Sequence, residues 1–248
     1  MKSYKKQLTG LVATSALAIC TMAPLTHAEV SGSVAIASSY HWRGFDLGSG
    51  TPAVSGDLVA SSGGLYGGMW VSSGDTTAGT EYDLFFGYGA EMGNFSFDVS
   101  YITYVYPTGP FEEVEGIGDF AELIFKVGLG PVSVFLNTNI SGASEQEWLD
   151  GTRYAFLDGE YMYYGVSADF GDFSLTVAQH DETVVLPDGS LGDPVEGYAG
   201  VTGDAAHLDL SYAYNDNLSF TFSTILSSEL GDGEPSPKFV VSYSLPIE

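Results

Sequence analysis

Residues 81–106 read EYDLFFGYGAEMGNFSFDVSYITYVY, and this stretch decides the fold. Apolar and polar side chains alternate in both halves, which is the period of a half-buried β-strand. The apolar positions are Tyr82, Leu84, Phe86, Tyr88, Phe95, Phe97, Val99 and Tyr101. The four residues between the halves, EMGN, predict a tight turn. We therefore predict a β-hairpin whose arms match the ~9–11 residues of a tilted transmembrane strand.

The same alternation recurs along the rest of the chain and predicts twelve strands in all. The predicted strands are residues 30–45, 53–60, 65–72, 81–90, 95–106, 119–129, 132–140, 160–170, 173–181, 205–214, 218–226 and 238–245. An apolar face of this kind can point into the core of a soluble sandwich or out toward lipid in a barrel. The connections between the strands discriminate between these two folds.

Short and longer connections alternate strictly along the predicted strands. The short ones are residues 61–64, 91–94, 130–131, 171–172 and 215–217. The longer ones are residues 46–51, 73–80, 107–118, 141–159, 182–204 and 227–237. Short periplasmic turns on one rim and long external loops on the other are typical of an outer-membrane barrel. We predict an all-β fold, an antiparallel up-and-down transmembrane β-barrel of about twelve strands.

Residues 1–28 have the features of a secretory signal peptide. Three lysines give the start a positive charge, an apolar run follows, and Thr26-His27-Ala28 is a small-residue cleavage site. We predict cleavage after Ala28, which leaves a single barrel domain of residues 29–248. Cys20 lies in this leader, so the predicted mature chain has no cysteine, unlike small secreted disulfide scaffolds.

The charge is strongly acidic, with 32 acidic residues against 7 lysines and arginines. The formal net charge of −25 becomes −28 once the three leader lysines are removed. Nucleic acid is excluded as a partner because so few basic residues cannot form a basic patch. We expect the outer membrane of a Gram-negative bacterium as the location, with its lipid, small solutes or ions and the barrel-insertion machinery as partners. No cofactor is expected.

The segment Ser39-Tyr40-His41-Trp42-Arg43-Gly44-Phe45 resembles the start of the mature proteins in the TorF family of porin-like proteins from Gram-negative bacteria. Further similar segments are Pro52-Ala53-Val54, Leu65-Tyr66-Gly67-Gly68-Met69-Trp70, the 81–107 hairpin and Asp119-Phe120-Ala121-Glu122-Leu123. The resemblance extends well to about residue 136 and loosely beyond. It implies an outer-membrane pore and says little about the solute.

Ionisable side chains on the polar parity of the strands are the predicted pore-lining residues. They are Arg43, Asp57, Glu81, Asp83, Asp98, Glu122, Lys126, Asp169, His207 and Asp209. Acids outnumber bases among them, which favours a cation-preferring pore with an acid-lined lumen. The opposite hypothesis is a lumen plugged by salt bridges of Arg43 and Lys126. Twelve strands enclose a narrower interior than the ~16–18 of wide porins, so any solute is small.

Two other functional classes were compared with the porin hypothesis. A hydrolase needs a Ser, a His and an orienting group, and His207 with Asp209 is a weak candidate pair without a G-x-S-x-G element. We predict that the protein is not an enzyme and holds no metal, because residues 187–189 and 232–234 read as turns rather than calcium loops. A non-conducting structural or adhesive barrel remains the main alternative.

Two further expectations concern the ends of the barrel. Trp42 is expected at the lipid interface, where tryptophan is favoured. The last predicted strand ends at Leu245 and is followed by Pro246, Ile247 and Glu248. Outer-membrane chains usually end on an aromatic residue, so this ending departs from the pattern by which the insertion machinery recognises barrels.

Overall fold

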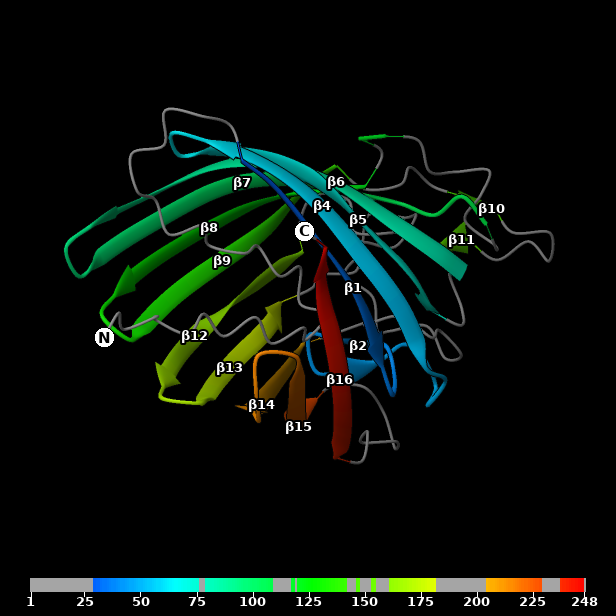
Figure 1. The fold of residues 1–248 in the computed structure, drawn as a ribbon. Coiled ribbons are helices and arrows are strands. Elements are labelled where there is room, and N and C mark those ends of the chain that lie inside the picture. The colour runs from blue at the N-terminus through cyan, green and yellow to red at the C-terminus, as the bar shows by residue number, and fades with distance from the viewer. Residues whose placement is uncertain are drawn as a thin grey trace.

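The computed structural model describes residues 29–75, 79–108, 117–118, 120–141, 146–147, 153–154, 161–181, 204–228 and 237–247. Twelve strands form one closed antiparallel barrel, in the order β1-β16-β15-β14-β13-β12-β9-β8-β7-β6-β5-β4, with β4 paired back to β1 (Figure 1). The predicted fold class and strand number are confirmed. The predicted leader, residues 1–28, lies outside the described residues.

The barrel strands follow the predicted ranges closely. They are β1 (Glu29–Ala37), β4 (Ala53–Ser62), β5 (Leu65–Asp75), β6 (Gly79–Met92), β7 (Phe95–Val105), β8 (Ala121–Leu129), β9 (Val132–Ser141), β12 (Met162–Phe170), β13 (Phe173–Asp181), β14 (Ala205–Ala213), β15 (Leu218–Ser228) and β16 (Lys238–Ile247). Each pairs with its sequence neighbour among the barrel strands, and β1 also pairs with β16. A short pair, β10 (Gln146–Glu147) with β11 (Arg153–Tyr154), lies between β9 and β12.

The alternation predicted from the sequence separates the two faces of the barrel wall. Apolar side chains point outward and are exposed, as in Leu58, Phe86 and Val166. Polar side chains of the other parity point inward, as in Glu81, Asp98 and Ser211, and are buried. A closed ring of strands with an apolar exterior satisfies its own backbone hydrogen bonds, which is what a hydrocarbon environment requires. No helix in the described part of the chain is long and apolar enough to cross a membrane.

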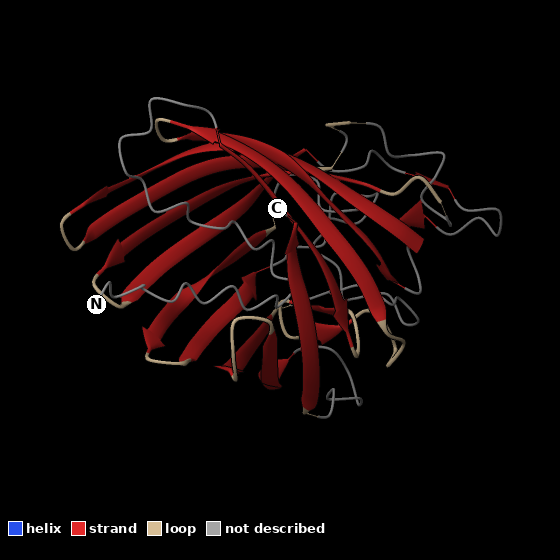
Figure 2. Ribbon diagram, viewed as in Figure 1, coloured by secondary structure: helices blue, strands red, loops and turns tan. Residues whose placement is uncertain are grey.

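The two rims differ in their connections (Figure 2). Tight turns join β4 to β5, β6 to β7, β8 to β9, β12 to β13 and β14 to β15 on one rim. Glycines with positive φ stand in four of them, at Gly63, Gly93, Gly130 and Gly171. The predicted longer connection at residues 73–80 is wrong: β5 runs on to Asp75 and β6 begins at Gly79, because the ladder continues past an irregularity between Ser72 and Asp75.

The first predicted strand is also corrected. β1 ends at Ala37 rather than at residue 45, and the chain then forms a small hairpin, β2 (His41–Trp42) and β3 (Phe45–Asp46), inside the ring of strands (Figure 1). Trp42 therefore does not lie at the lipid interface. Its ring packs 5.8 Å from the ring of His180 on β13, within the barrel.

Candidate functional site

Residues 38–52, which we call the internal hairpin, fold into the lumen from the rim opposite the tight turns. The tip is a two-residue turn in which Arg43 has φ 46° and Gly44 has φ 93°. Two positive φ values match the type I′ turn that suits the twist of a two-residue hairpin. An arginine in this region costs of order 1–3 kcal/mol, which the surrounding contacts must offset.

Arg43 at the tip is fixed by a planar two-point contact with Glu122 on β8. Nη1 donates to Oε1 at 3.0 Å and Nη2 donates to Oε2 at 2.6 Å. The hydroxyls of Tyr161 and Tyr104 accept further hydrogen bonds from the guanidinium at 2.9 and 3.3 Å. Arg43 is 1% exposed and Glu122 0%. Burial alone would lower the pKa of Arg43, but the Glu122 carboxylate together with Tyr161 and Tyr104 more than reverses this, so the pKa is raised.

Aromatic rings complete the surroundings of the guanidinium. Its Cζ lies 4.6 Å from the centroid of the Trp42 ring and 4.5 Å from that of Tyr163. A cation over the face of an aromatic ring is attracted by the ring's quadrupole. Sequence reasoning did not identify Tyr104, Tyr161 and Tyr163 as members of this site. Their inward parity was the available signal, since a tyrosine there has no lipid to face.

Histidines hold the opposite side of the tip. The Nε2 of His180 on β13 donates to the Arg43 carbonyl oxygen at 2.8 Å, so its Nδ1 accepts from the Tyr161 hydroxyl at 2.8 Å. A Cβ added at Gly44 would lie 2.7 Å from Cβ and Cγ of His207 on β14, which shows how closely the turn approaches that strand. The tip is therefore enclosed by β8, β13 and β14.

The base of the internal hairpin is anchored on other strands. The Tyr40 hydroxyl donates to Glu81 on β6 at 2.5 Å, and the Tyr40 ring stacks on Trp70 of β5 with centroids 6.0 Å apart. Asp46 accepts from Ser39 and lies 3.5 Å from the Lys238 Nζ on β16. Partial burial acts to raise the pKa of Asp46, but these contacts outweigh it and lower the pKa.

A buried carboxylate lies beside the internal hairpin on β14. Asp209 Oδ1 is 3.5 Å from His41 Nε2 and 3.3 Å from His207 Nδ1. The other ring nitrogen of His207, Nε2, is 2.9 Å from the Tyr163 hydroxyl. His41 has no hydrogen-bond partner on either ring nitrogen, and the Oδ1 of Asp209 has none. Within the described residues, no group of three or more His, Cys, Asp or Glu is arranged to hold a metal ion.

The remaining predicted lumen residues lie nearer the rim of tight turns. Asp57 on β4 accepts from Ser33 at 2.8 Å, and Asp98 on β7 accepts from the Tyr66 hydroxyl at 2.9 Å. Lys126 on β8 is the cross-strand neighbour of Asp98, and Asp169 on β12 is exposed. Among the described residues, no hydrogen bond joins these four side chains to the internal hairpin.

The ten predicted residues thus divide into two groups. Six surround or belong to the internal hairpin: Arg43, Glu81, Asp83, Glu122, His207 and Asp209. Four line the barrel below it: Asp57, Asp98, Lys126 and Asp169. They lie on the inner face of the wall or, for Arg43, on the internal hairpin itself. The first group is almost fully buried and holds the internal hairpin.

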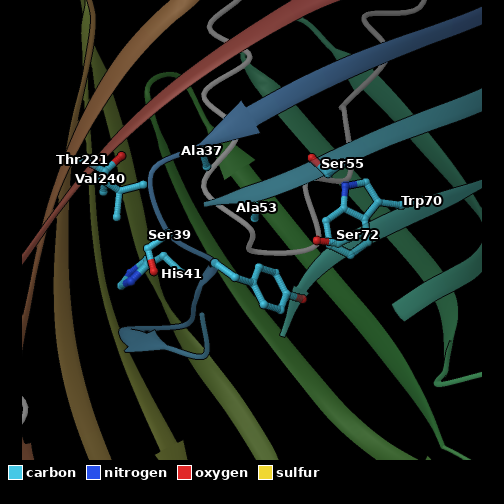
Figure 3. Close-up of a pocket in the computed structure, with 10 residues that line it drawn as sticks. Ala37, Ser39, His41, Ala53, Ser55, Trp70, Ser72, Thr221 and Val240 are labelled. Carbon is cyan, nitrogen blue, oxygen red and sulfur yellow. The ribbon is translucent and has the colours of Figure 1, made fainter. Parts of the chain in front are cut away.

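A pocket of about 20 Å³ lies beside the internal hairpin (Figure 3). Space of this size admits a water molecule, which needs ≳ 10–15 Å³. Ser39, Tyr40 and His41 of the internal hairpin form one side. The other lining residues belong to β1, β4, β5, β15 and β16: Ala37, Ala53, Ser55, Trp70, Ser72, Thr221 and Val240.

One protein family matches most of this chain. The model of a family described as "Bacterial protein of unknown function (Gcw_chp)" matches residues 22–221. No curated protein matches the sequence significantly. The TorF family is a different name, and the resemblance to it stays a prediction.

Solved structures resemble this chain at low sequence identity, and one of them, with a TM-score of 0.52, shares its fold. One, described as "Unveiling the Mechanism Behind the in-meso Crystallization of Membrane Proteins", is 9% identical with a TM-score of 0.52 and covers 88% of this chain and 83% of its own. "KdgM porin" is 8% identical with a TM-score of 0.42, covering 89% and 99%. The "NanC porin" structure is 11% identical with a TM-score of 0.43, covering 88% and 98%.

Proposed function

This chain belongs to the Gcw_chp family of bacterial proteins, and we propose that it forms a narrow outer-membrane channel for small solutes, with a preference for cations. The observation that carries the proposal is the combination of a closed twelve-stranded barrel with an apolar exterior and a polar, acid-rich interior. A soluble barrel would expose this apolar exterior to water at a large cost, whereas lipid accommodates it.

The charges inside the barrel support the cation preference. Below the internal hairpin, three acids, Asp57, Asp98 and Asp169, stand against one base, Lys126. Around the internal hairpin, Glu122 is neutralised by Arg43, but Glu81 is held by tyrosine hydroxyls, which carry no charge. The interior potential is therefore negative, which concentrates cations and disfavours anions.

The internal hairpin limits the size of the solute. Twelve strands already enclose less space than the ~16–18 strands of wide porins, and the internal hairpin occupies part of that space. Small ions and small neutral molecules are therefore the expected solutes. Lipid and the barrel-insertion machinery are the expected partners of such a protein.

A planar bilayer experiment tests the proposal. The refolded protein is inserted under a KCl gradient. The reversal potential is measured for the wild type, for Asp57→Asn plus Asp98→Asn, and for Glu91→Gln at the exposed end of β6 as a control. The expected result is channels that favour K⁺, with a weaker preference in the double variant only. Barrels shown to be folded and inserted that carry no current would overturn the channel in favour of a structural barrel.

A non-conducting structural barrel is the second candidate, because the internal hairpin contacts eight strands of the wall, β5 to β8, β12 to β14 and β16. A hydrolase is supported less well. His207 and Asp209 are buried at 0% and 3% exposure, and the Nε2 of His207 faces Tyr163 rather than a serine. We therefore expect no esterase activity that depends on His207.

A further inference from the structure

We propose that solutes pass the internal hairpin on one side only, along the wall formed by β15, β16, β1, β4 and β5, and that Asp57 is the residue that sets cation preference on this route. This inference rests on the proposed channel function and adds to it a path and a selectivity residue. The internal hairpin divides the lumen into two sides. Large side chains fill the side that faces β6 to β14, and a pocket lies on the side that faces β15, β16, β1, β4 and β5.

The side from β6 round to β14 is filled by large side chains that join the internal hairpin to the wall. Tyr40 reaches Glu81 on β6, and Arg43 reaches Glu122 on β8. Tyr161, Tyr163 and His180 pack together as a buried cluster around the tip. Within the described part of the chain, side chains of this size in mutual contact leave no route for a solute on this side.

The opposite wall carries small inward side chains. Representative positions are Ala35 and Ala37 on β1, Ser55 on β4, Thr221 on β15, and Val240 and Ser242 on β16. The pocket beside the internal hairpin lies against this wall, with Trp70 at its edge (Figure 3). The wall is contiguous, because these five strands are neighbours in the barrel order.

Unpartnered buried polar atoms point to water or a polar solute in the same space. His41 lines the pocket and is 3% exposed, and apart from the 3.5 Å approach to Asp209 neither ring nitrogen has a partner. The Oγ of Ser223, the next inward residue after Thr221 on β15, is likewise buried without a partner. Buried polar groups of this kind are normally satisfied by water, and the pocket beside His41 has room for a water molecule.

Asp57 is the predicted lumen residue on this wall. It follows Ser55 on the inward face of β4, is half-buried, and accepts one hydrogen bond from Ser33. The other nine predicted residues lie on the internal hairpin or on strands from β6 to β14. A cation moving past Ser55 toward the rim of tight turns therefore meets the Asp57 carboxylate first.

Cysteine accessibility tests the route. In a Cys20→Ser background, Ser55→Cys places a thiol on the proposed path, and Ala178→Cys on β13 places one behind Tyr163 on the filled side. Both proteins are treated with a cationic methanethiosulfonate, and labelling is read by mass and by single-channel conductance. Ser55→Cys is expected to label and to lose more than half of its conductance, whereas Ala178→Cys stays unlabelled.

The selectivity residue is tested in the same assay by Asp57→Asn, with Asp83→Asn as the buried control. Asp57→Asn is expected to lower the K⁺/Cl⁻ permeability ratio at least twofold and Asp83→Asn to change it little. Conducting channels in which Ala178→Cys is blocked and Ser55→Cys is inert would overturn the route. An unchanged K⁺/Cl⁻ permeability ratio in Asp57→Asn would show that Asp57 does not set the selectivity. A folded and inserted wild type that carries no current would refute the channel itself. This result is distinguishable from the failure of the route and from the failure of Asp57 as the selectivity residue.

Discussion

Arg43 and Glu122 meet inside the barrel across 79 residues of sequence, as a two-point ion pair between the tip of the internal hairpin and β8. Both side chains are buried, so each charge depends on the other. This pair makes the internal hairpin a fixed part of the lumen rather than a surface loop.

Removing one charge of this pair is expected to destabilise the barrel strongly. Glu122→Gln leaves the Arg43 charge buried without its partner, which typically costs 3–5 kcal/mol. Urea unfolding in lipid vesicles measures the loss, with Glu91→Gln at the exposed end of β6 as the control. The double variant Arg43→Gln plus Glu122→Gln is expected to lose less than the sum of the two single variants, and strict additivity would show that the pair is not coupled.

Any side chain at position 44 is expected to destabilise the turn at the tip of the internal hairpin. Gly44→Ala adds a Cβ 2.7 Å from His207 and also meets a backbone with φ 93°. Gly130→Ala in a tight turn is the matched control, since its φ is also positive, at 59°, and a Cβ there meets nothing within 4 Å. Open-channel current noise and thermal stability report the outcome. Equal effects in the two variants would mean that the contact with His207 adds nothing.

Gly87 is expected to be needed because Tyr66 crosses over it. A Cβ at Gly87 would lie 2.4 Å from the Tyr66 hydroxyl oxygen, which passes over β6 to reach Asp98 on β7. Gly87→Ala should therefore lower the free energy of unfolding by about 1–3 kcal/mol, as overpacking does. Combining it with Tyr66→Ala should remove only part of that additional loss, because the added Cβ would still lie 2.7 Å from the Cβ of Ser100. A full additional loss in the Tyr66→Ala background would place the cause elsewhere.

Adjacent positions on β4 should respond oppositely to a charge. Leu58 points outward and is 53% exposed, whereas Val59 points inward. Leu58→Lys is expected to cost about 2–4 kcal/mol if it lies near the middle of the bilayer. Val59→Lys faces the lumen and should cost much less. Folding yield into vesicles measures both, and equal tolerance at the two positions would contradict a lipid-facing exterior.

The alternation of side chains was sufficient to predict the barrel. Each strand shows its outward and inward positions locally, as in Phe86 against Gly87, so the number of strands and their faces follow from sequence alone. The lengths of the connections predicted which of them share a rim. The exception is the connection between β5 and β6, where both strands extend into the predicted loop.

The internal hairpin could not be predicted by the same reasoning. Alternation continues through His41 and Arg43, so the segment looks like the end of a strand. What bends it inward is the positive φ at Arg43 and a partner, Glu122, that becomes a neighbour only when the barrel closes. Contacts across the lumen depend on closure and register, which no local pattern contains.

The pairing of β1 with β16 places the first and last strands of the barrel side by side, with Ser38 hydrogen-bonded to Val241. This seam joins segments about 200 residues apart, so it can form only after all the intervening strands are available. The internal hairpin follows β1 directly, so it leaves the wall at this seam. Closure of the barrel therefore encloses this segment, and in the proposed channel the two outermost strands in sequence also hold the constriction in place.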